Sequence, residues 1–395
     1  MRVVHFSDLH LGFRQYQRLT PTGINQREAD VARTFHRVVD AVIARQPDLV
    51  VIAGDVFHSV RPTNPAILHA FLQFSRLVQA LPGVPVVMAA GNHDIPRSSE
   101  TGCILRLFEP LGVHVADLEA RRFEFPERGL SVLAVPDVVG ARPALVPDPS
   151  ARHNVLVLHG AVQGVLPARA ASVDRASYEV APEDLAAAQW SYVALGDYHV
   201  HKEIAPNAYY SGSIDYTSSN AWGELVEQEK AGVPGKGFIE FDLDTGTHTF
   251  HAVRPSRELV DLPSFSARGM TGAEVDAAIR SAVEACPGGI DDKIVRLVIR
   301  DVARHINNDL DHKALREFKR RALHFQVEML RPDVRLLRGE GAPGQRQTLA
   351  EFVRERLLTR TLPGDVNRDQ LIERVFQYLD QATAQELASG AEAEG

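Results

Sequence analysis

Residues 49–58 read Leu-Val-Val-Ile-Ala-Gly-Asp-Val-Phe-His, an apolar run that passes directly into glycine, aspartate and histidine. A short apolar run bounded by a polar turn is typical of a strand that is buried on both faces. Similar runs, each followed by a polar loop, occur at residues 3–6, 84–88, 155–158 and 192–195. Helical periodicity over residues 28–44 and 64–81 separates the first three strands, and this alternation is typical of an α/β sheet with parallel strands.

The loops that follow these strands carry side chains that bind metal ions. They contain D-L-H (Asp8, His10), G-D-V-F-H (Asp55, His58), G-N-H-D (Asn92, His93), L-H-G (His159) and G-D-Y-H-V-H (Asp197, His199, His201). The carboxyl ends of parallel strands meet at one edge of a sheet, which is the usual place for a site. Residues two apart on an extended backbone face the same side, so Asp8 and His10 can hold one ion. Each loop alone is a weak signal, but the five together predict a metal centre.

The composition limits the class of protein. The 395 residues are 45% hydrophobic and 24% charged, which is typical of a globular chain of two or three domains. The net charge of −8 argues against a protein whose whole surface is basic and coats a polyanion. Local basic patches remain compatible with binding to nucleic acid. The two cysteines exclude a disulfide framework, and we expect a reducing, cytoplasmic location. No apolar run approaches the ~20 residues that a membrane-spanning helix needs, so we expect no membrane-spanning segment.

Taken as a set, the loops resemble the calcineurin-like metallophosphoesterase superfamily, whose pattern is D-x-H, G-D, G-N-H-[DE], a later histidine and G-H-x-H. The resemblance covers about residues 1–255. Within it, G-D-V-F-H-S-V-R-P at residues 54–62, the spacing to Y-S-G-S at residues 210–213 and the C-terminal additions are similar to the SbcD family. Proteins of that family are DNA double-strand-break-repair nucleases that work with an SbcC-type, SMC-like ATPase. The resemblance implies an α/β fold: a two-sheet β-sandwich flanked by helices, with a small α/β capping domain and C-terminal helices.

The family's roles can be carried over where positions match. The resemblance implies two divalent ions, one held by Asp8, His10, Asp55 and His199 and the other by Asp55, Asn92, His159 and Asp197. Asp55 would bridge the two ions. His93 would stand near the scissile phosphate, protonating the leaving oxygen or stabilising the transition state, and His58 would orient the DNA phosphate. Oxygen and imidazole donors favour manganese, with zinc, iron and magnesium left open.

The chain departs from the family pattern at Asp197, where the family usually has histidine. An alignment without a gap makes Asp197 and His199 the ligands and keeps the Y-S-G-S segment in register. An insertion of two residues would instead make His199 and His201 the ligands. We prefer the ungapped alignment. The extra carboxylate is a hard oxygen ligand, so we expect Asp197 to favour manganese over zinc.

We expect five segments along the chain: a metallophosphoesterase domain (1–255), a capping and DNA-binding domain (256–337), a glycine-rich linker (338–347), a helical segment (348–384) and a disordered tail (385–395). In the capping domain, a strand is expected at 293–299 and a helix at 312–323. Lys313, Arg316 and Arg320 share one face of that helix. They are either a phosphate-contacting surface or an ordinary solvated face.

The resemblance therefore implies a manganese-dependent DNA nuclease of the SbcD type, with 3′-to-5′ exonuclease activity on duplex ends and endonuclease activity on single strands. Residues 348–384 would bind the SbcC-type ATPase, or else pack on their own domain. The apolar helix after Asn64 would help to form a homodimer. A phosphomonoesterase or small-molecule phosphodiesterase of the same superfamily is one alternative. A scaffold that holds the ATPase on DNA without catalysis is the other, and Asp197 is the residue that suggests it.

Overall fold

The structure is a computed structural model that describes residues 1–96, 102–137, 143–165, 178–332, 357–358 and 370–377. The chain divides into two compact units, Met1–Pro332 and Asp333–Gly395. In the second unit, residues 357–358 and 370–377 are helical. The expected linker at 338–347 and the expected tail at 385–395 lie outside the described residues, as does most of the 348–384 segment.

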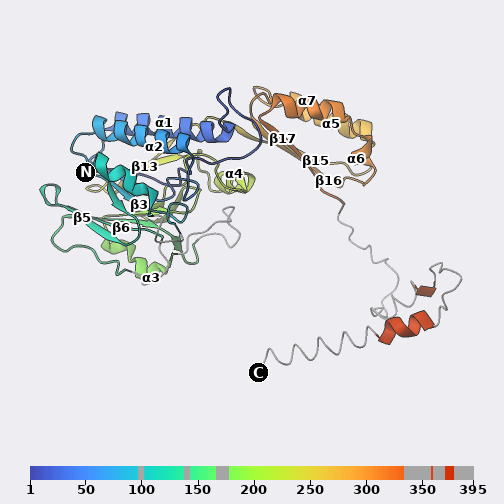
Figure 1. Cartoon of the computed structure of the whole chain (residues 1–395). Coiled ribbons are helices and arrows are strands. Elements are labelled where there is room, and N and C mark those ends of the chain that lie inside the picture. Colours follow the sequence, from blue (N-terminus) through green and yellow to red (C-terminus); the bar gives the residue numbers. More distant parts are fainter. Residues whose placement is uncertain (97–101, 138–142, 166–177, 333–356, 359–369, 378–395) are drawn as a thin grey trace. The chain divides into compact units, whose positions relative to one another are not determined.

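The first unit begins with a six-stranded sheet in the order β14-β13-β1-β2-β3-β4. Its parallel strands are β1 (Arg2–Phe6), β2 (Leu49–Ala53), β3 (Val86–Ala89) and β4 (His114–Ala116). The hairpin of β13 (Gly237–Asp242) and β14 (Thr247–Ala252) adds to β1 in the antiparallel sense. The helices α1 (Gln26–Arg45), α2 (Asn64–Ala80) and η1 (Ile104–Leu111) pack on one face of this sheet (Figure 1).

A second six-stranded sheet has the order β11-β12-β10-β7-β6-β5. Its strands are β5 (Arg121–Phe125), β6 (Leu130–Val135), β7 (His153–His159), β10 (Tyr192–Gly196), β11 (Lys202–Ala205) and β12 (Ala208–Tyr210). Shorter elements lie around it: η2 (Pro126–Arg128), β8 (Ala161–Val162), β9 (Glu179–Val180), α3 (Pro182–Leu185) and η3 (Ala187–Gln189). Helix α4 (Ala221–Lys230) lies in the chain between β12 and β13.

The two sheets pack face to face, which confirms the predicted sandwich flanked by helices. Successive side chains of a strand point to opposite faces. In β1, Val4 and Phe6 therefore pack against the helices, whereas Val3 packs between the sheets. The strand is buried on both faces, which explains its nearly continuous apolar sequence. The loop with Asp8 and His10 follows directly after the last residue of this strand, Phe6.

A smaller α/β arrangement, which we call the cap, follows with its own hydrophobic core. It contains β15 (Leu259–Ser266), α5 (Gly272–Glu284), β16 (Ile294–Arg300), α6 (Ile306–Asp309), α7 (His312–Arg321) and β17 (His324–Met329). The three strands are parallel in the order β15-β16-β17. Strand β15 was not expected from the sequence, because it contains Pro263. Proline is tolerated there because β15 is an edge strand with an irregular register near that residue.

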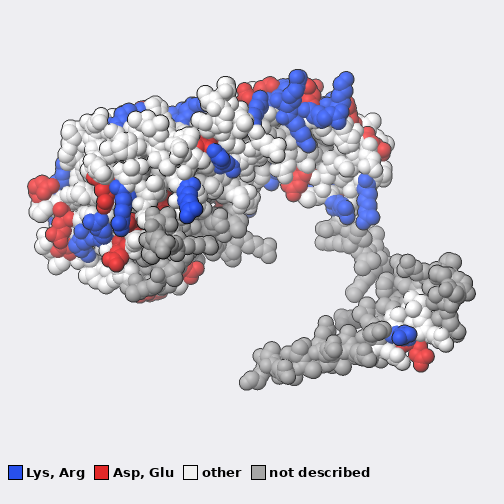
Figure 2. All heavy atoms as spheres, viewed as in Figure 1, with Lys and Arg blue, Asp and Glu red and all other residues white. Residues whose placement is uncertain are grey.

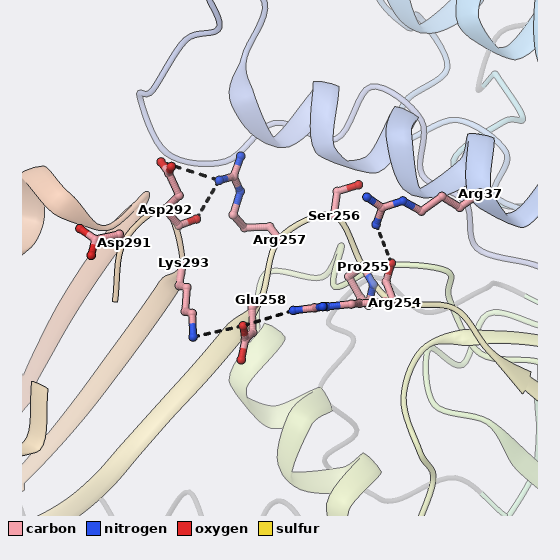
Figure 3. Close-up of a pocket in the computed structure, with 9 residues that line it drawn as sticks. All are labelled: Arg37, Arg254, Pro255, Ser256, Arg257, Glu258, Asp291, Asp292 and Lys293. Atoms are coloured by element: carbon pink, nitrogen blue, oxygen red, sulfur yellow. Dashed lines mark hydrogen bonds and ion pairs between the residues drawn. The ribbon is translucent and has the colours of Figure 1, made fainter. Parts of the chain in front are cut away.

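Residues 254–258 connect the sandwich to the cap and line a pocket of about 460 Å³ (Figure 3). Arg257 donates two hydrogen bonds of 2.9 Å to Asp30 on α1 and a third, of 2.8 Å, to the carbonyl of Asp292 in the cap. Lys293 pairs with Glu258 at 3.2 Å. The basic side chains of this pocket thus already have acidic or carbonyl partners, and we assign no phosphate site to it.

None of the helices in the described part of the chain combines the length and the apolar composition that crossing a membrane requires.

Candidate metal centre

The five loops predicted from the sequence meet in space. Three follow β1, β2 and β3 of the first sheet, and two lie at the ends of β7 and β10 of the second sheet. The centre is therefore built across the sandwich rather than on one sheet edge. The ligand atoms form three groups, each within 4.8 Å: Asp8, His10 and His199; Asp8, Asp55 and His159; His10, His58 and His93.

Asp55 lies in the middle of the predicted ligands. Its Oδ2 atom is 3.7 Å from Nε2 of His10 and 3.6 Å from Nε2 of His159. On the first side, Nε2 of His10 is 3.0 Å from Nε2 of His199. On the second side, Oδ1 of Asn92 is 3.1 Å from Nε2 of His159. Carboxylate, amide and imidazole atoms thus converge on either side of one carboxylate, which is a donor set that fits two divalent ions.

For two of the histidines, a hydrogen bond on the side of the ring away from the centre determines which nitrogen faces the centre. Nδ1 of His159 donates to the carbonyl of Ala53 at 2.8 Å, so Nε2 is the nitrogen that faces Asp55. Nδ1 of His93 donates to the carbonyl of His58 at 2.8 Å. These tautomers follow from the acceptors, because a carbonyl oxygen can only accept. The rings are therefore oriented by the protein itself.

The last loop brings His199, and not His201, to the other candidate ligands. The backbone amide of Asp197 donates to both carboxylate oxygens of Asp8, at 3.1 and 3.3 Å, so this loop is tied to the first. His201 instead donates from Nδ1 to the carbonyl of Tyr210 at 3.0 Å, and its ring stacks on Phe250 with centroids 4.5 Å apart. This placement agrees with the ungapped alignment.

Four candidate ligands have a backbone in the left-handed region. Their φ angles are 53° at Asp8, 45° at His10, 51° at Asp55 and 100° at Asp197. Such conformations cost on the order of 1–3 kcal/mol each in residues other than glycine, and they persist only where the surroundings impose them. Here the amides of Asp8 and His10 donate to the carbonyls of Gly54 and Asp55, at 3.0 and 2.9 Å. The two loops thus hold each other in the strained conformation.

Two motif glycines are needed because other loops approach them closely. A Cβ atom at Gly54 would lie 2.1 Å from Nδ1 of His159, and the backbone there also has φ of 90°. A Cβ atom at Gly91 would lie 2.1 Å from Oδ1 of Asp55. Both distances are far shorter than van der Waals contact. The glycines before Asp55 and Asn92 therefore let the ligand loops pack against one another.

Sequence reasoning assigned no role to Asp94, although the residue ends the G-N-H-D motif. Its buried carboxylate accepts hydrogen bonds from the amides of Val56, Phe57 and Gly91, at 3.1, 2.9 and 3.0 Å. It therefore ties the loop of Asp55 to the loop of Asn92. Sequence reasoning also missed Glu224, whose Oε1 atom is 2.8 Å from Nδ1 of His199. No local signal could have found Glu224, because it lies 25 residues from its partner.

The buried charges shift the pKa values of the centre in ways that favour a cation. Burial raises the pKa of Asp55 to about 7, although His159 and His93 act in the opposite direction. Burial alone would lower the pKa of His159, but Asp55, Asp8 and Asp197 outweigh it and raise the value to about 10. Burial and the neighbouring His199 and His93 lower the pKa of His10 well below its usual range. Without an ion, protons therefore compensate part of the buried negative charge.

The predicted DNA-binding residues lie away from these groups, on α7 of the cap. Lys313, Arg316 and Arg320 are all exposed, and Figure 2 shows Lys and Arg side chains gathered over α7. Arg320 pairs with Glu317 at 2.7 Å. No ion pair is recorded for Lys313 or Arg316 among the described residues. The face is therefore less basic than the sequence suggests, but two of its cations remain available to solvent.

Comparisons with known proteins agree with this geometry. The family model of the calcineurin-like phosphoesterases matches residues 1–225, which include all the candidate metal ligands. The DNA double-strand break repair protein Mre11 of Methanopyrus kandleri is 29% identical over 285 residues, covering 66% of this chain and 58% of that protein. The Mre11 of Sulfurisphaera tokodaii is 29% identical over 51% of this chain and 49% of its own length. That of Thermoplasma acidophilum is 26% identical over 64% of each. The chain thus spans about half the length of the first two relatives.

We expect metal binding to release protons. His159 holds a proton at neutral pH in the metal-free protein, and an ion at its Nε2 atom displaces that proton. The affinity for Mn²⁺ should therefore rise by at least about tenfold per pH unit between about pH 6 and pH 8, because the proton of His159 and, below about pH 7, that of Asp55 leave when the ion binds. Titration calorimetry in two buffers of different ionisation enthalpy measures the release. His36→Gln, outside the centre, should leave it unchanged, and equal heats in both buffers would contradict the assignment.

Proposed function

Because the chain belongs to the calcineurin-like phosphoesterase family, we propose that it is a metal-dependent DNA nuclease of the SbcD and Mre11 type. It hydrolyses phosphodiester bonds in DNA double-strand-break repair, as a 3′-to-5′ exonuclease on duplex ends and an endonuclease on single strands. The observation that carries the proposal is the position of Asp55 between two sets of imidazole and oxygen donors. The homology to Mre11 proteins supports DNA as the substrate.

In this proposal, two divalent ions occupy the centre, and Mn²⁺ suits its oxygen-rich donor set. One ion is held by Asp8, His10, Asp55 and His199, and the other by Asp55, Asn92, His159 and Asp197. When bound, such ions neutralise the phosphodiester, acidify a water molecule and align the attacking and leaving oxygens. The carboxylate of Asp55 sets the separation of the two sites. Burial raises its pKa to about 7 in the metal-free protein, so a bound cation displaces a proton there at or below neutral pH.

His93 and His58 act on the phosphate rather than as ligands. The bond from Nδ1 of His93 to the carbonyl of His58 holds the ring and leaves Nε2 for the substrate. The two rings stack with centroids 5.3 Å apart, and that of His10 is 4.9 Å from His93. His93 thus stands beside the proposed ligands, where it can give a proton to the leaving oxygen or stabilise charge in the transition state. His58 orients the phosphate.

The nuclease proposal predicts cleavage of DNA in the presence of Mn²⁺. End-labelled linear duplex and circular single-stranded DNA should both be cut, and His93→Ala and Asp55→Ala should each reduce the rate by at least about 100-fold. Glu127→Gln, exposed on η2 before the amino end of β6, is a control far from the chemistry. The same preparations should be tested on a phosphomonoester. Turnover of the monoester without DNA cleavage would instead identify a phosphatase. Cleavage of neither substrate by a protein that binds no metal would identify a scaffold.

We propose that the exposed face of α7 contacts DNA phosphates. Contacts of this kind position the backbone and carry no sequence information. Replacing Lys313, Arg316 and Arg320 with Gln should lower the slope of log binding constant against log salt by about 2 to 3, since each phosphate contact releases about one counterion. The control is Arg128→Gln, which should leave the slope unchanged. Arg128 lies beside the amino end of β6, at the edge opposite the centre. An unchanged slope in the triple variant would contradict the proposal.

We propose that the chain forms a homodimer through α2. Leu68 and Leu72 lie one helical turn apart and are 61% and 54% exposed, which leaves an apolar strip on the surface. Two copies of such a strip can bury each other. Leu68→Glu combined with Leu72→Glu should therefore yield a monomer in sedimentation equilibrium, with nuclease activity per chain measured alongside. Gln79→Glu, exposed on the same helix, should not change the oligomeric state. A wild-type chain that sediments as a monomer would overturn the proposal.

We propose that residues 348–384 bind an SbcC-type ATPase. Residues 370–377 are helical, and a short helix needs a partner surface to be stable. Truncation after Arg346 should abolish co-purification with the ATPase and preserve Mn²⁺-dependent cleavage, because the metal centre lies within the first unit. Co-purification of the truncated chain would show that another surface binds the partner.

A further inference from the structure

Helix α4 places a buried carboxylate directly behind one of the proposed metal ligands. Glu224 is 1% exposed, and its Oε1 atom accepts a hydrogen bond of 2.8 Å from Nδ1 of His199. The opposite nitrogen of the same ring, Nε2, is the one that lies 3.0 Å from Nε2 of His10. A carboxylate on one side of an imidazole fixes the tautomer and the orientation of the ring and makes the other nitrogen a stronger ligand.

Lys236 completes this arrangement. Its Nζ atom donates to Oε2 of Glu224 at 2.7 Å, to the carbonyl of His199 at 2.8 Å and to Oγ of Ser213 at 2.9 Å. The lysine is 2% exposed, so both charges of the pair are buried. Glu224 therefore uses one oxygen for the lysine and the other for the histidine. Lys236 therefore contacts both the carboxylate of Glu224 and the backbone carbonyl of His199.

The helix that presents Glu224 is anchored along its length. The side chain of Asn220 caps it by accepting from the amide of Gly223. The guanidinium of Arg296, in cap strand β16, lies over the ring of Trp222 at 4.8 Å. Near the other end, the hydroxyl of Tyr216 contacts Gln228 at 3.2 Å. Glu224 thus stands on a rigid support rather than on a loop.

We propose that Glu224 is a positioning residue for the metal centre: it holds His199 in the tautomer that binds an ion through Nε2. This inference rests on the proposed role of His199 as a ligand. The hydrogen bonds of the carboxylate go to His199 and Lys236, so we expect it to act on the ion at His199 rather than on both ions. Burying the charges of Glu224 and Lys236 costs free energy, because both groups lose their hydration. The orientation of the proposed ligand His199 gives this ion pair a function.

The substitution Glu224→Gln tests the proposal. In this variant one of the two oxygens becomes an NH2 group, which only donates. The cationic Nζ of Lys236 keeps the remaining oxygen, so Nδ1 of His199 loses its acceptor. The affinity for one of two Mn²⁺ ions should fall by about 10- to 100-fold, and the affinity for the other should stay within about twofold. The free Mn²⁺ signal in electron paramagnetic resonance gives both affinities and the stoichiometry. Glu229→Gln makes the same charge change at an exposed position of α4 and should have no effect.

A double-mutant cycle shows whether Glu224 acts through His199. His199→Ala should lose the same ion, and adding Glu224→Gln to it should cause no further loss. If Glu224→Gln retains both affinities while His199→Ala does not, the positioning role is refuted and the ligand set stands. If His199→Ala binds both ions as the wild type does, the proposed ligand set itself is wrong. An additional loss in the double variant would also refute a role exerted through His199.

The unpaired charge of Lys236 provides the remaining control. In Glu224→Gln, Lys236 loses its anionic partner, which destabilises the fold. The double variant Glu224→Met with Lys236→Met removes both charges and also the acceptor for Nδ1 of His199. It should recover thermal stability, yet the loss of one ion should remain. Recovery of the affinity together with the stability would show that the carboxylate served only to balance the lysine, and would overturn the proposal.

Discussion

The carboxylate of Asp55 is the constraint on which the rest of the centre depends. It stands between an imidazole from the loop after β1 and an imidazole at the end of β7, so it joins donors from both sheets of the sandwich. Its position leaves no room for a side chain at Gly91. Its environment is dry enough to raise its pKa to about 7 when no cation is present. A buried carboxylate of this kind costs free energy until a cation replaces the protons around it.

Groups outside the ligand set offset this cost in free energy by holding the ligand loops and rings in place. Left-handed backbone at several ligands stores strain, and hydrogen bonds between the loops hold it in place. Asp94 ties the second loop to the third, the carbonyl of Ala53 orients His159, and Glu224 stands behind His199. The fold therefore supplies two kinds of support. The parallel strands bring the ligands together, and the groups behind them set ring orientation and loop contact.

The sequence predicted the parts of the fold that depend on local signals. Apolar runs that end in a polar loop identified β1, β2, β3, β7 and β10 and the loops of the centre. The sequence suggested one common sheet edge, whereas the structure distributes these loops over both sheets. Strand β15 was missed because Pro263 weakens its local signal, and α4 was missed for lack of a strong apolar period. The net charge of the α7 region overstated its free cations, because Arg320 and Arg321 pair with Glu317 and Asp291. The pair of Arg321 with Asp291 joins residues 30 apart and leaves no pattern in one sequence, whereas that of Arg320 with Glu317 is a local pair three residues apart on α7.

Anomalous diffraction from crystals grown with Mn²⁺ tests the two-ion centre most directly. Two manganese peaks should appear with Asp55 between them, one beside His10 and His199 and the other beside Asn92 and His159. A single peak, or manganese bound among His10, His58 and His93 instead, would contradict the two-ion centre on which the proposed nuclease activity rests.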